Sequence, residues 1–293
     1  MINDSDVSHY LNTHCYNIER LEFDKPGIFD SFVDATYIIT MEGSDREKEL
    51  YQKLKEFNPT RVVYISHNKG FKKCNKILYE KKVYYDVINS YHNVFYHSRK
   101  NNYNNILLLE DDYEFDLELT TQSVANNIKQ FFDKHRNETF FYNIGAIPPM
   151  FIPILLDKYH YMGIQTLPNH SVIYTRQIQN DILHNIIKPT EKVKFFDSWL
   201  SKKYRGYFYK YPICYQTFPT TDQSSEWKLP LWDSYVTPVV KYIRLDKNAK
   251  PGFSNAYKIT LAINYFFFII VSVTVILLIM NIIYIMINKK SFI

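Results

Sequence analysis

Glycine and cysteine are scarce in this 293-residue sequence. Seven glycines are too few for a collagen-like chain or for long glycine-rich linkers. The three cysteines, Cys15, Cys74 and Cys214, are odd in number and far apart, which fits neither a disulfide framework nor a zinc-binding pattern. We therefore expect reduced cysteines with structural roles.

A strong charge of one sign is also lacking. The 35 basic residues exceed the 30 acidic ones only slightly, and no run of lysine and arginine is long enough to predict a nucleic-acid partner. The N-terminus has acidic residues and lacks the apolar core of a signal peptide. Hydrophobic residues make up 46% of the chain, so the length suits one well-packed domain and an anchor.

One long hydrophobic run stands near the C-terminus. No charged residue lies between Lys258 and Lys289. The run exceeds the about 20 apolar residues that cross a bilayer. Tyr265 and Tyr284 lie near its ends, where amphipathic rings favour the membrane interface. We predict a transmembrane helix over 259–288 in preference to a buried core helix.

Basic residues flank this predicted span unequally. Four precede it and two follow it: Arg244, Lys247, Lys250 and Lys258, then Lys289 and Lys290. This bias favours a cytosolic N-terminal side, and the short tail is typical of a tail-anchored, single-pass protein. Glycosylation sequons, among them those at Asn137 and Asn169, would then never be used.

The chain divides into five predicted segments: a polar N-terminal segment (1–30), a folded domain (31–240), a juxtamembrane segment (241–258), the transmembrane helix (259–288) and a tail (289–293). Within the domain, short apolar strands alternate with amphipathic helices. We expect strands at 36–40, 61–66, 106–109, 140–144, 172–174 and 207–211, and helices at 44–57, 87–95 and 177–187. Such alternation predicts an α/β fold whose ligands bind beyond the carboxyl ends of the parallel strands.

Three acidic residues follow the third expected strand directly. Along an extended chain Glu110 and Asp112 point to one side and Asp111 to the other. Two carboxylates spaced in this way suit Mg²⁺ or Mn²⁺, with coordination positions left open for phosphate oxygens. Sugar-nucleotide transferases use such an arrangement, whereas the alternative is an acidic turn after a strand. Glu114 and Asp116 extend the acidic run and are expected to be solvated.

Two motifs together resemble the family 25 glycosyltransferases, which include lipooligosaccharide and collagen galactosyltransferases. Ser90-Tyr91-His92 resembles the family's Ser-His helix, with one residue inserted, and Leu109-Glu110-Asp111-Asp112 matches its Leu-Glu-Asp-Asp strand end. The family's first strand carries an Asn that Ile38-Ile39-Thr40-Met41 lacks. Further likeness lies in Asp197-Ser198-Trp199-Leu200 and in Pro212 and Gln216, so the resemblance spans about 36–216.

The resemblance implies a GT-A-like (Rossmann-like) mixed sheet flanked by helices. It also implies transfer of a sugar, galactose or glucose, from a nucleotide-diphosphate donor to a hydroxyl acceptor on a glycan, lipid or protein. The transfer would be inverting and would use Mn²⁺ or Mg²⁺. The residues expected to act are Glu110 and Asp112 on the metal, Arg46, Lys72, His92 and Asp111 on the donor, and Asp197 as the base. Lys73 and Lys76 are further candidates for the diphosphate, and Trp227 and Trp232 for stacking on an acceptor sugar.

Two other functions are compatible with the sequence. The missing Asn and the interrupted Ser-His pair are compatible with an inactive relative that serves as a membrane scaffold. Clustered carboxylates also serve metal-dependent phosphoryl chemistry, although the sequence contains no P-loop and no further acidic motif.

Overall fold

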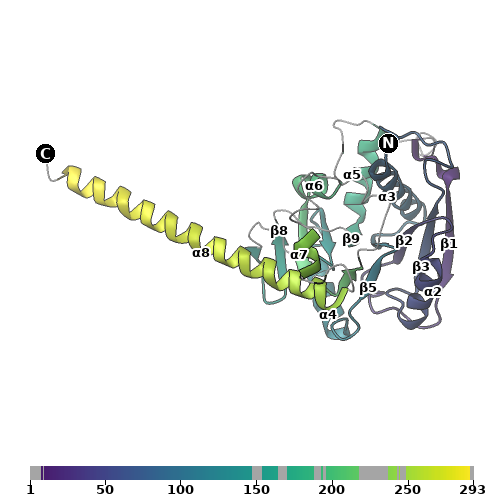
Figure 1. Ribbon diagram of the computed structural model, residues 1–293, viewed down its shortest axis with the longest axis horizontal. Coiled ribbons are helices and arrows are strands. Elements are labelled where there is room, and N and C mark those ends of the chain that lie inside the picture. Colours follow the sequence, from purple (N-terminus) through teal and green to yellow (C-terminus); the bar gives the residue numbers. More distant parts are fainter. Residues whose placement is uncertain are drawn as a thin grey trace.

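A nine-stranded mixed β-sheet with helices against its faces makes up the centre of the protein (Figure 1). The computed structural model describes residues 8, 10–146, 154–163, 170–187, 193, 196–217, 237–242, 244 and 249–290. Trp227, Trp232 and the sequon residue Asn169 lie outside the described residues.

The strands of the large sheet, in the order in which they lie side by side, are β1 (Tyr16–Glu22), β3 (Val62–Asn68), β2 (Ala35–Met41), β4 (Asn105–Glu110), β9 (Ser171–Thr175), β6 (Phe140–Asn143), β10 (Arg205–Tyr209), β8 (His160–Gly163) and β7 (Ile154–Leu155). Strands β3, β2 and β4 are mutually parallel, and β6 pairs parallel with β10. Strand β9 runs antiparallel between β4 and β6. A second sheet pairs β5 (Tyr113–Phe115) with β11 (Cys214–Gln216).

The helices are η1 (Thr13–Cys15), α2 (Glu47–Glu56), α3 (Val83–Lys100), α4 (Gln122–Lys134), α5 (Arg176–Ile187), α6 (Phe196–Lys203), α7 (Thr237–Tyr242) and α8 (Ala249–Lys290). The elements expected from the sequence are confirmed: each predicted strand and helix corresponds to one of these, with ends that differ by a few residues.

Strand β4 explains why the sheet needs cover on both faces. Its apolar residues alternate between two separate cores, with Leu107 and Leu109 in one and Ile106 and Leu108 in the other. All four are fully buried. A continuous apolar run is typical of a strand covered on both faces, because successive side chains point to opposite sides.

The N-terminal segment contributes more to the sheet than the sequence indicates. The prediction of a polar, irregular segment over 1–30 misses β1, which pairs antiparallel with β3 from Tyr16↔Asn68 to Glu22↔Val62. Most β1 side chains are partly or fully exposed because β1 is an edge strand, so its sequence lacks a hydrophobic run.

The prediction of three reduced cysteines is wrong for two of them. Cys15 and Cys74 form a disulfide with Cα atoms 5.8 Å apart, whereas Cys214 is free and buried. The two cysteines are far apart in the sequence. They meet because the antiparallel pairing of β1 with β3 brings η1 beside the loop that follows β3.

Helix α8 has a docked half and an exposed half. In the docked half, Ser254 Oγ and Tyr265 Oη lie 3.0 and 3.1 Å from the hydroxyls of Tyr215 and Tyr161. From Phe266 onward the apolar side chains are exposed, and the helix extends away from the domain (Figure 1). The stretch Ser254–Ile287 contains an 18-residue window with a mean hydropathy of 2.9, and it is long and apolar enough to cross a membrane.

Candidate active site

The carboxyl end of β4 carries the acidic motif at a point where the order of the strands reverses. From β2 the chain proceeds to β3 on one side, and it then returns to β4 on the other side. In α/β proteins ligands commonly bind beyond the carboxyl ends of the strands at such a reversal of strand order. Glu110 is the last residue of β4.

Glu110 is held by a contact from the neighbouring helix α3. The Tyr91 hydroxyl donates a hydrogen bond of 2.8 Å to Glu110 Oε1. The Glu110 backbone N–H donates to the carbonyl oxygen of His170 at 2.9 Å, which fixes the strand end against the segment before β9. One carboxylate oxygen of Glu110 is therefore oriented by Tyr91.

Asp111 belongs to a different set of contacts. Thr40 Oγ1, at the end of β2, donates to Asp111 Oδ2 at 2.7 Å. The Arg46 guanidinium, at the start of α2, forms an ion pair with Asp111 Oδ1. The structure thus brings together two predicted donor-binding residues, Arg46 and Asp111, as partners of each other.

Asp112 is 5% exposed and is incompletely satisfied. Gln216 Nε2 donates to Asp112 Oδ2 at 3.1 Å, and the Thr217 backbone N–H donates to its carbonyl oxygen at 2.9 Å. Within the described part of the chain, Asp112 Oδ1 is buried without a hydrogen-bond partner. Leaving a buried carboxylate oxygen unpaired costs free energy, so this atom is suited to an external ligand.

Acidic side chains are concentrated at this strand end. Burial, followed by repulsion from Asp112, raises the pKa of Glu110 to about 8. Burial also raises the pKa of Asp112, and Asp111 adds to the effect. A divalent cation between Glu110 and Asp112 would oppose both causes, because it stabilises the charged form of each carboxylate.

Asp197 lies in the first turn of α6 and acts on the same cluster. After burial and Asp112, its charge contributes to the raised pKa of Glu110. Burial raises the pKa of Tyr91 far above its ordinary value, and Glu110 and Asp197 reinforce that shift. The predicted base is therefore close enough to interact with the predicted metal ligands, although Asp197 and Glu110 are far apart in sequence.

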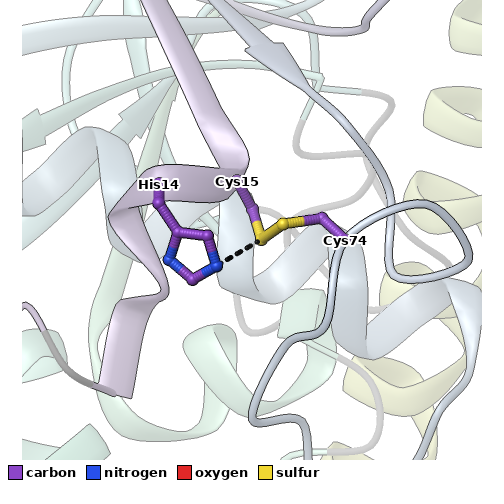
Figure 2. A group of neighbouring side chains, drawn as sticks. All are labelled: His14, Cys15 and Cys74. Carbon is purple, nitrogen blue, oxygen red and sulfur yellow. Dashed lines mark hydrogen bonds between the residues drawn. A yellow bond between two sulfur atoms is a disulfide. The ribbon is translucent and has the colours of Figure 1, made fainter.

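Carboxylate oxygens such as those of Glu110 and Asp112 are the ligands that hard cations prefer. Mg²⁺ is commonly bound through one or two carboxylates together with waters and substrate phosphates. Among the described residues, the close group of three potential ligand side chains lies elsewhere, at His14, Cys15 and Cys74 (Figure 2). Glu110 and Asp112 could supply two of the oxygen ligands.

Other predicted donor contacts are less well supported. Lys72 is exposed in the loop after β3. His92 follows Tyr91 in α3, and successive helical side chains point about 100° apart, so the Tyr91–Glu110 hydrogen bond does not place His92 beside Glu110. Desolvation of its ring lowers the pKa of His92 to about 3, so the imidazole is neutral at physiological pH.

Lys76 does not have the predicted role in neutralising a diphosphate. Its ammonium is completely buried and pairs with Asp86. It also donates to Tyr16 Oη at 2.8 Å and to Asn68 Oδ1. Its positive charge is thus used inside the fold, where Lys76 joins the end of β3 to the N-terminus of α3.

Sequence reasoning missed two residues at the site. Thr40 occupies the end of the strand that lacks the family's Asn, and its hydroxyl contacts Asp111. Tyr91, which interrupts the Ser-His pair, contacts Glu110, whereas Ser90 accepts a hydrogen bond from Asn68. Helical spacing indicates that Tyr91 belongs to the buried face of α3, but it does not identify the carboxylate.

Comparisons with known proteins leave the family open. No family model matches this chain, and no curated protein matches it. Among solved structures, apo-UDP-glucose pyrophosphorylase is similar over 62% of this chain and 75% of its own, with a TM-score of 0.34 and 9% identity.

Proposed function

We propose that this protein is a membrane-anchored, metal-dependent glycosyltransferase. It would transfer a sugar, galactose or glucose, from a nucleotide-diphosphate donor to a hydroxyl acceptor. The observation that carries the proposal is the pair of buried carboxylates, Glu110 and Asp112, at the reversal of strand order. One of their oxygens has no partner within the described residues. The resemblance of Leu109-Glu110-Asp111-Asp112 to the family 25 strand end supports the same proposal.

Glu110 and Asp112 would hold Mn²⁺ or Mg²⁺. The bound ion would supply positive charge that neutralises the donor diphosphate as the nucleotide leaves. Tyr91 and Gln216 would orient the two carboxylates, since each donates to one of them. Arg46 and Asp111 would hold the end of β2 beside the end of β4.

Asp197 would serve as the base for an inverting transfer. The acceptor oxygen would attack the anomeric carbon while its proton moves to the Asp197 carboxylate, and the bond from the anomeric carbon to the diphosphate would break. The first turn of a helix favours a negatively charged carboxylate, which suits a base that starts deprotonated.

The exposed half of α8 would cross the bilayer. Phe266–Ile287 spans roughly 33 Å at about 1.5 Å per residue, close to the about 30 Å thickness of a hydrocarbon core. Tyr265, whose hydroxyl lies 3.1 Å from that of Tyr161, would mark the boundary between protein and membrane. The prediction of a cytosolic domain, inferred from flanking charge, is not part of this proposal.

Manganese-dependent hydrolysis of nucleotide-diphosphate sugars tests the proposed activity. With the full chain in detergent, we expect hydrolysis that requires Mn²⁺ and falls about 100- to 1,000-fold in Asp112→Asn, because one electrostatic contact to the diphosphate site is lost. Glu114→Gln is the matched control, since this acidic residue is exposed two positions away. Equal activity of Asp112→Asn and wild type would refute the metal role, and no hydrolysis of any donor in the panel would favour the inactive scaffold.

A further inference from the structure

The Cys15–Cys74 disulfide joins two segments that the sheet brings side by side. Cys15 ends η1 immediately before β1, and Cys74 lies in the loop after β3 (Figure 2). The Lys69 backbone N–H donates to the Cys15 carbonyl oxygen at 3.0 Å, so the β1–β3 pairing extends up to the disulfide. Cys15 is fully buried and Cys74 is partly buried. The cross-link is therefore part of the packed fold.

Disulfides of this kind persist in oxidising compartments and are rare in the cytosol. In a reducing compartment the same group would instead present two thiols beside His14, whose Nε2 lies 3.5 Å from Cys15 Sγ (Figure 2). With the disulfide closed, neither sulfur is a thiolate ligand. This group therefore has two possible chemical states, a dithiol and a disulfide, and the structure contains the disulfide.

A glycosylation sequon lies on the surface of the same domain. Asn137-Glu138-Thr139 falls in the connection between α4 and β6. Asn137 is exposed and lies in a turn, as an acceptor asparagine must be for an enzyme to reach it. The disulfide and the sequon are independent features, and both suit the lumenal or extracellular side of a membrane.

The docked half of α8 weakens the charge argument for the opposite orientation. If the span begins at Phe266, Arg244 and Lys247 lie about 20 residues before it, at the limit at which flanking charges influence orientation. Lys250 and Lys258 then remain on one side, against two lysines on the other, Lys289 and Lys290. The basic excess that predicts a cytosolic domain is lost.

We propose that the domain faces an oxidising compartment, where Cys15 and Cys74 are joined and Asn137 carries an N-linked glycan. Disulfide formation would release two protons and pass two electrons to a thiol–disulfide oxidoreductase. In glycosylation the Asn137 amide nitrogen would bond to the anomeric carbon of a polyprenyl-diphosphate oligosaccharide, with loss of one amide proton and of the polyprenyl diphosphate. This proposal does not depend on the glycosyltransferase activity.

Expression of the full chain with microsomes tests the glycan. We expect a mobility shift that endoglycosidase removes and that decreases by one glycan in both Asn137→Gln and Thr139→Ala. Both variants remove the sequon, but Thr139→Ala leaves the asparagine in place. The same result in both therefore points to the sequon and not to the loss of the asparagine side chain. Asn126→Gln, an exposed asparagine of α4 outside any sequon, is the control and should keep the shift. Absence of an Asn137-dependent shift would overturn the proposal.

Counting free thiols on the same material tests the disulfide. After denaturation without reductant, a maleimide–polyethylene glycol reagent should add once, at Cys214, and three times after reduction. Three additions without reductant would place the domain in a reducing compartment and contradict the proposed orientation.

Discussion

Two clusters of buried charge lie near the carboxyl edge of the sheet, and they differ in balance. Near the end of β3, Lys76 pairs with Asp86, and the lysine also donates to Asn68 and Tyr16. At the end of β4, carboxylates gather instead, and the arginine nearby is paired with Asp111. The first cluster pairs its charges, whereas the second gathers carboxylates whose pKa values are raised, that of Glu110 to about 8.

This difference in charge balance favours a structural role for the Lys76–Asp86 cluster and a functional role for the cluster at the end of β4. Burying a charge is costly unless it is paired, so a completed pair such as Lys76–Asp86 contributes to a unique fold. An uncompensated cluster lowers stability and persists where a ligand supplies the missing charge. This comparison places Lys76 in the fold and is the basis on which we propose that the Glu110–Asp112 pair binds a ligand.

The largest expected effect is on stability, in the balanced cluster. Lys76→Met should lower the free energy of unfolding by about 3–5 kcal/mol, because Asp86 stays buried without its partner. Urea denaturation measures this. Lys72→Met, at an exposed position of the same loop, should change stability by less than about 0.5 kcal/mol. Equal stability of the two variants would contradict the assignment of Lys76 to the fold.

In the acidic cluster at the end of β4, we expect a substitution to reduce activity and to leave stability unchanged. Glu110→Gln should reduce manganese-dependent donor hydrolysis by about 100- to 1,000-fold without lowering stability in the absence of metal, because glutamine resembles the uncharged form of Glu110 that its raised pKa favours at neutral pH. Steady-state kinetics and urea denaturation on one preparation give both quantities. A variant that is inactive and also strongly destabilised would place Glu110 with Lys76 as a structural residue.

A smaller effect is expected at the residue that orients the cluster. Tyr91→Phe removes the hydroxyl that donates to Glu110 Oε1 and should weaken Mn²⁺ affinity by about 10- to 100-fold. Tyr84→Phe, in the first turn of the same helix, is the control and should bind Mn²⁺ like the wild type. Unchanged affinity in Tyr91→Phe would remove Tyr91 from the site.

The subtlest effect is a dependence of stability on pH. The pKa of Glu110 is about 8 in the folded protein and ordinarily 4.5, so the folded state retains a proton that the unfolded state has released. The contribution of Glu110 to stability is therefore greatest below pH 4.5 and is lost as the pH rises through 8.

Thermal unfolding in metal-free buffers between these pH values measures this dependence. Glu110→Gln should flatten the profile, and so should added Mn²⁺, because metal binding favours the ionised carboxylates. A profile that Glu110→Gln leaves unchanged would show that another group titrates.

The sequence predicted the strands that have apolar runs and the acidic strand end, because local pattern determines both. It missed β1, whose exposed edge position gives no hydrophobic run, and β5 and β11, which are three residues long. It also missed the Cys15–Cys74 disulfide, because a pairing between distant segments has no signal in a single sequence.

Within the site, the acidic residues could be predicted and their partners could not. Glu110 and Asp112 follow from the spacing along a strand. The contacts of Thr40 and Tyr91 depend on how β2 and α3 pack beside β4, which is a tertiary property. Lys76 was misassigned for the same reason, since only the fold reveals that Asp86 is its partner.

Binding of Mn²⁺, measured directly by electron paramagnetic resonance, tests the central claim without requiring turnover. Wild type and Glu114→Gln should bind one ion with the same affinity in the presence of a nucleotide-diphosphate sugar, and Asp112→Asn should bind it at least about 10-fold more weakly. Equal Mn²⁺ binding by Asp112→Asn and wild type would contradict the assignment of the acidic end of β4 as the metal site.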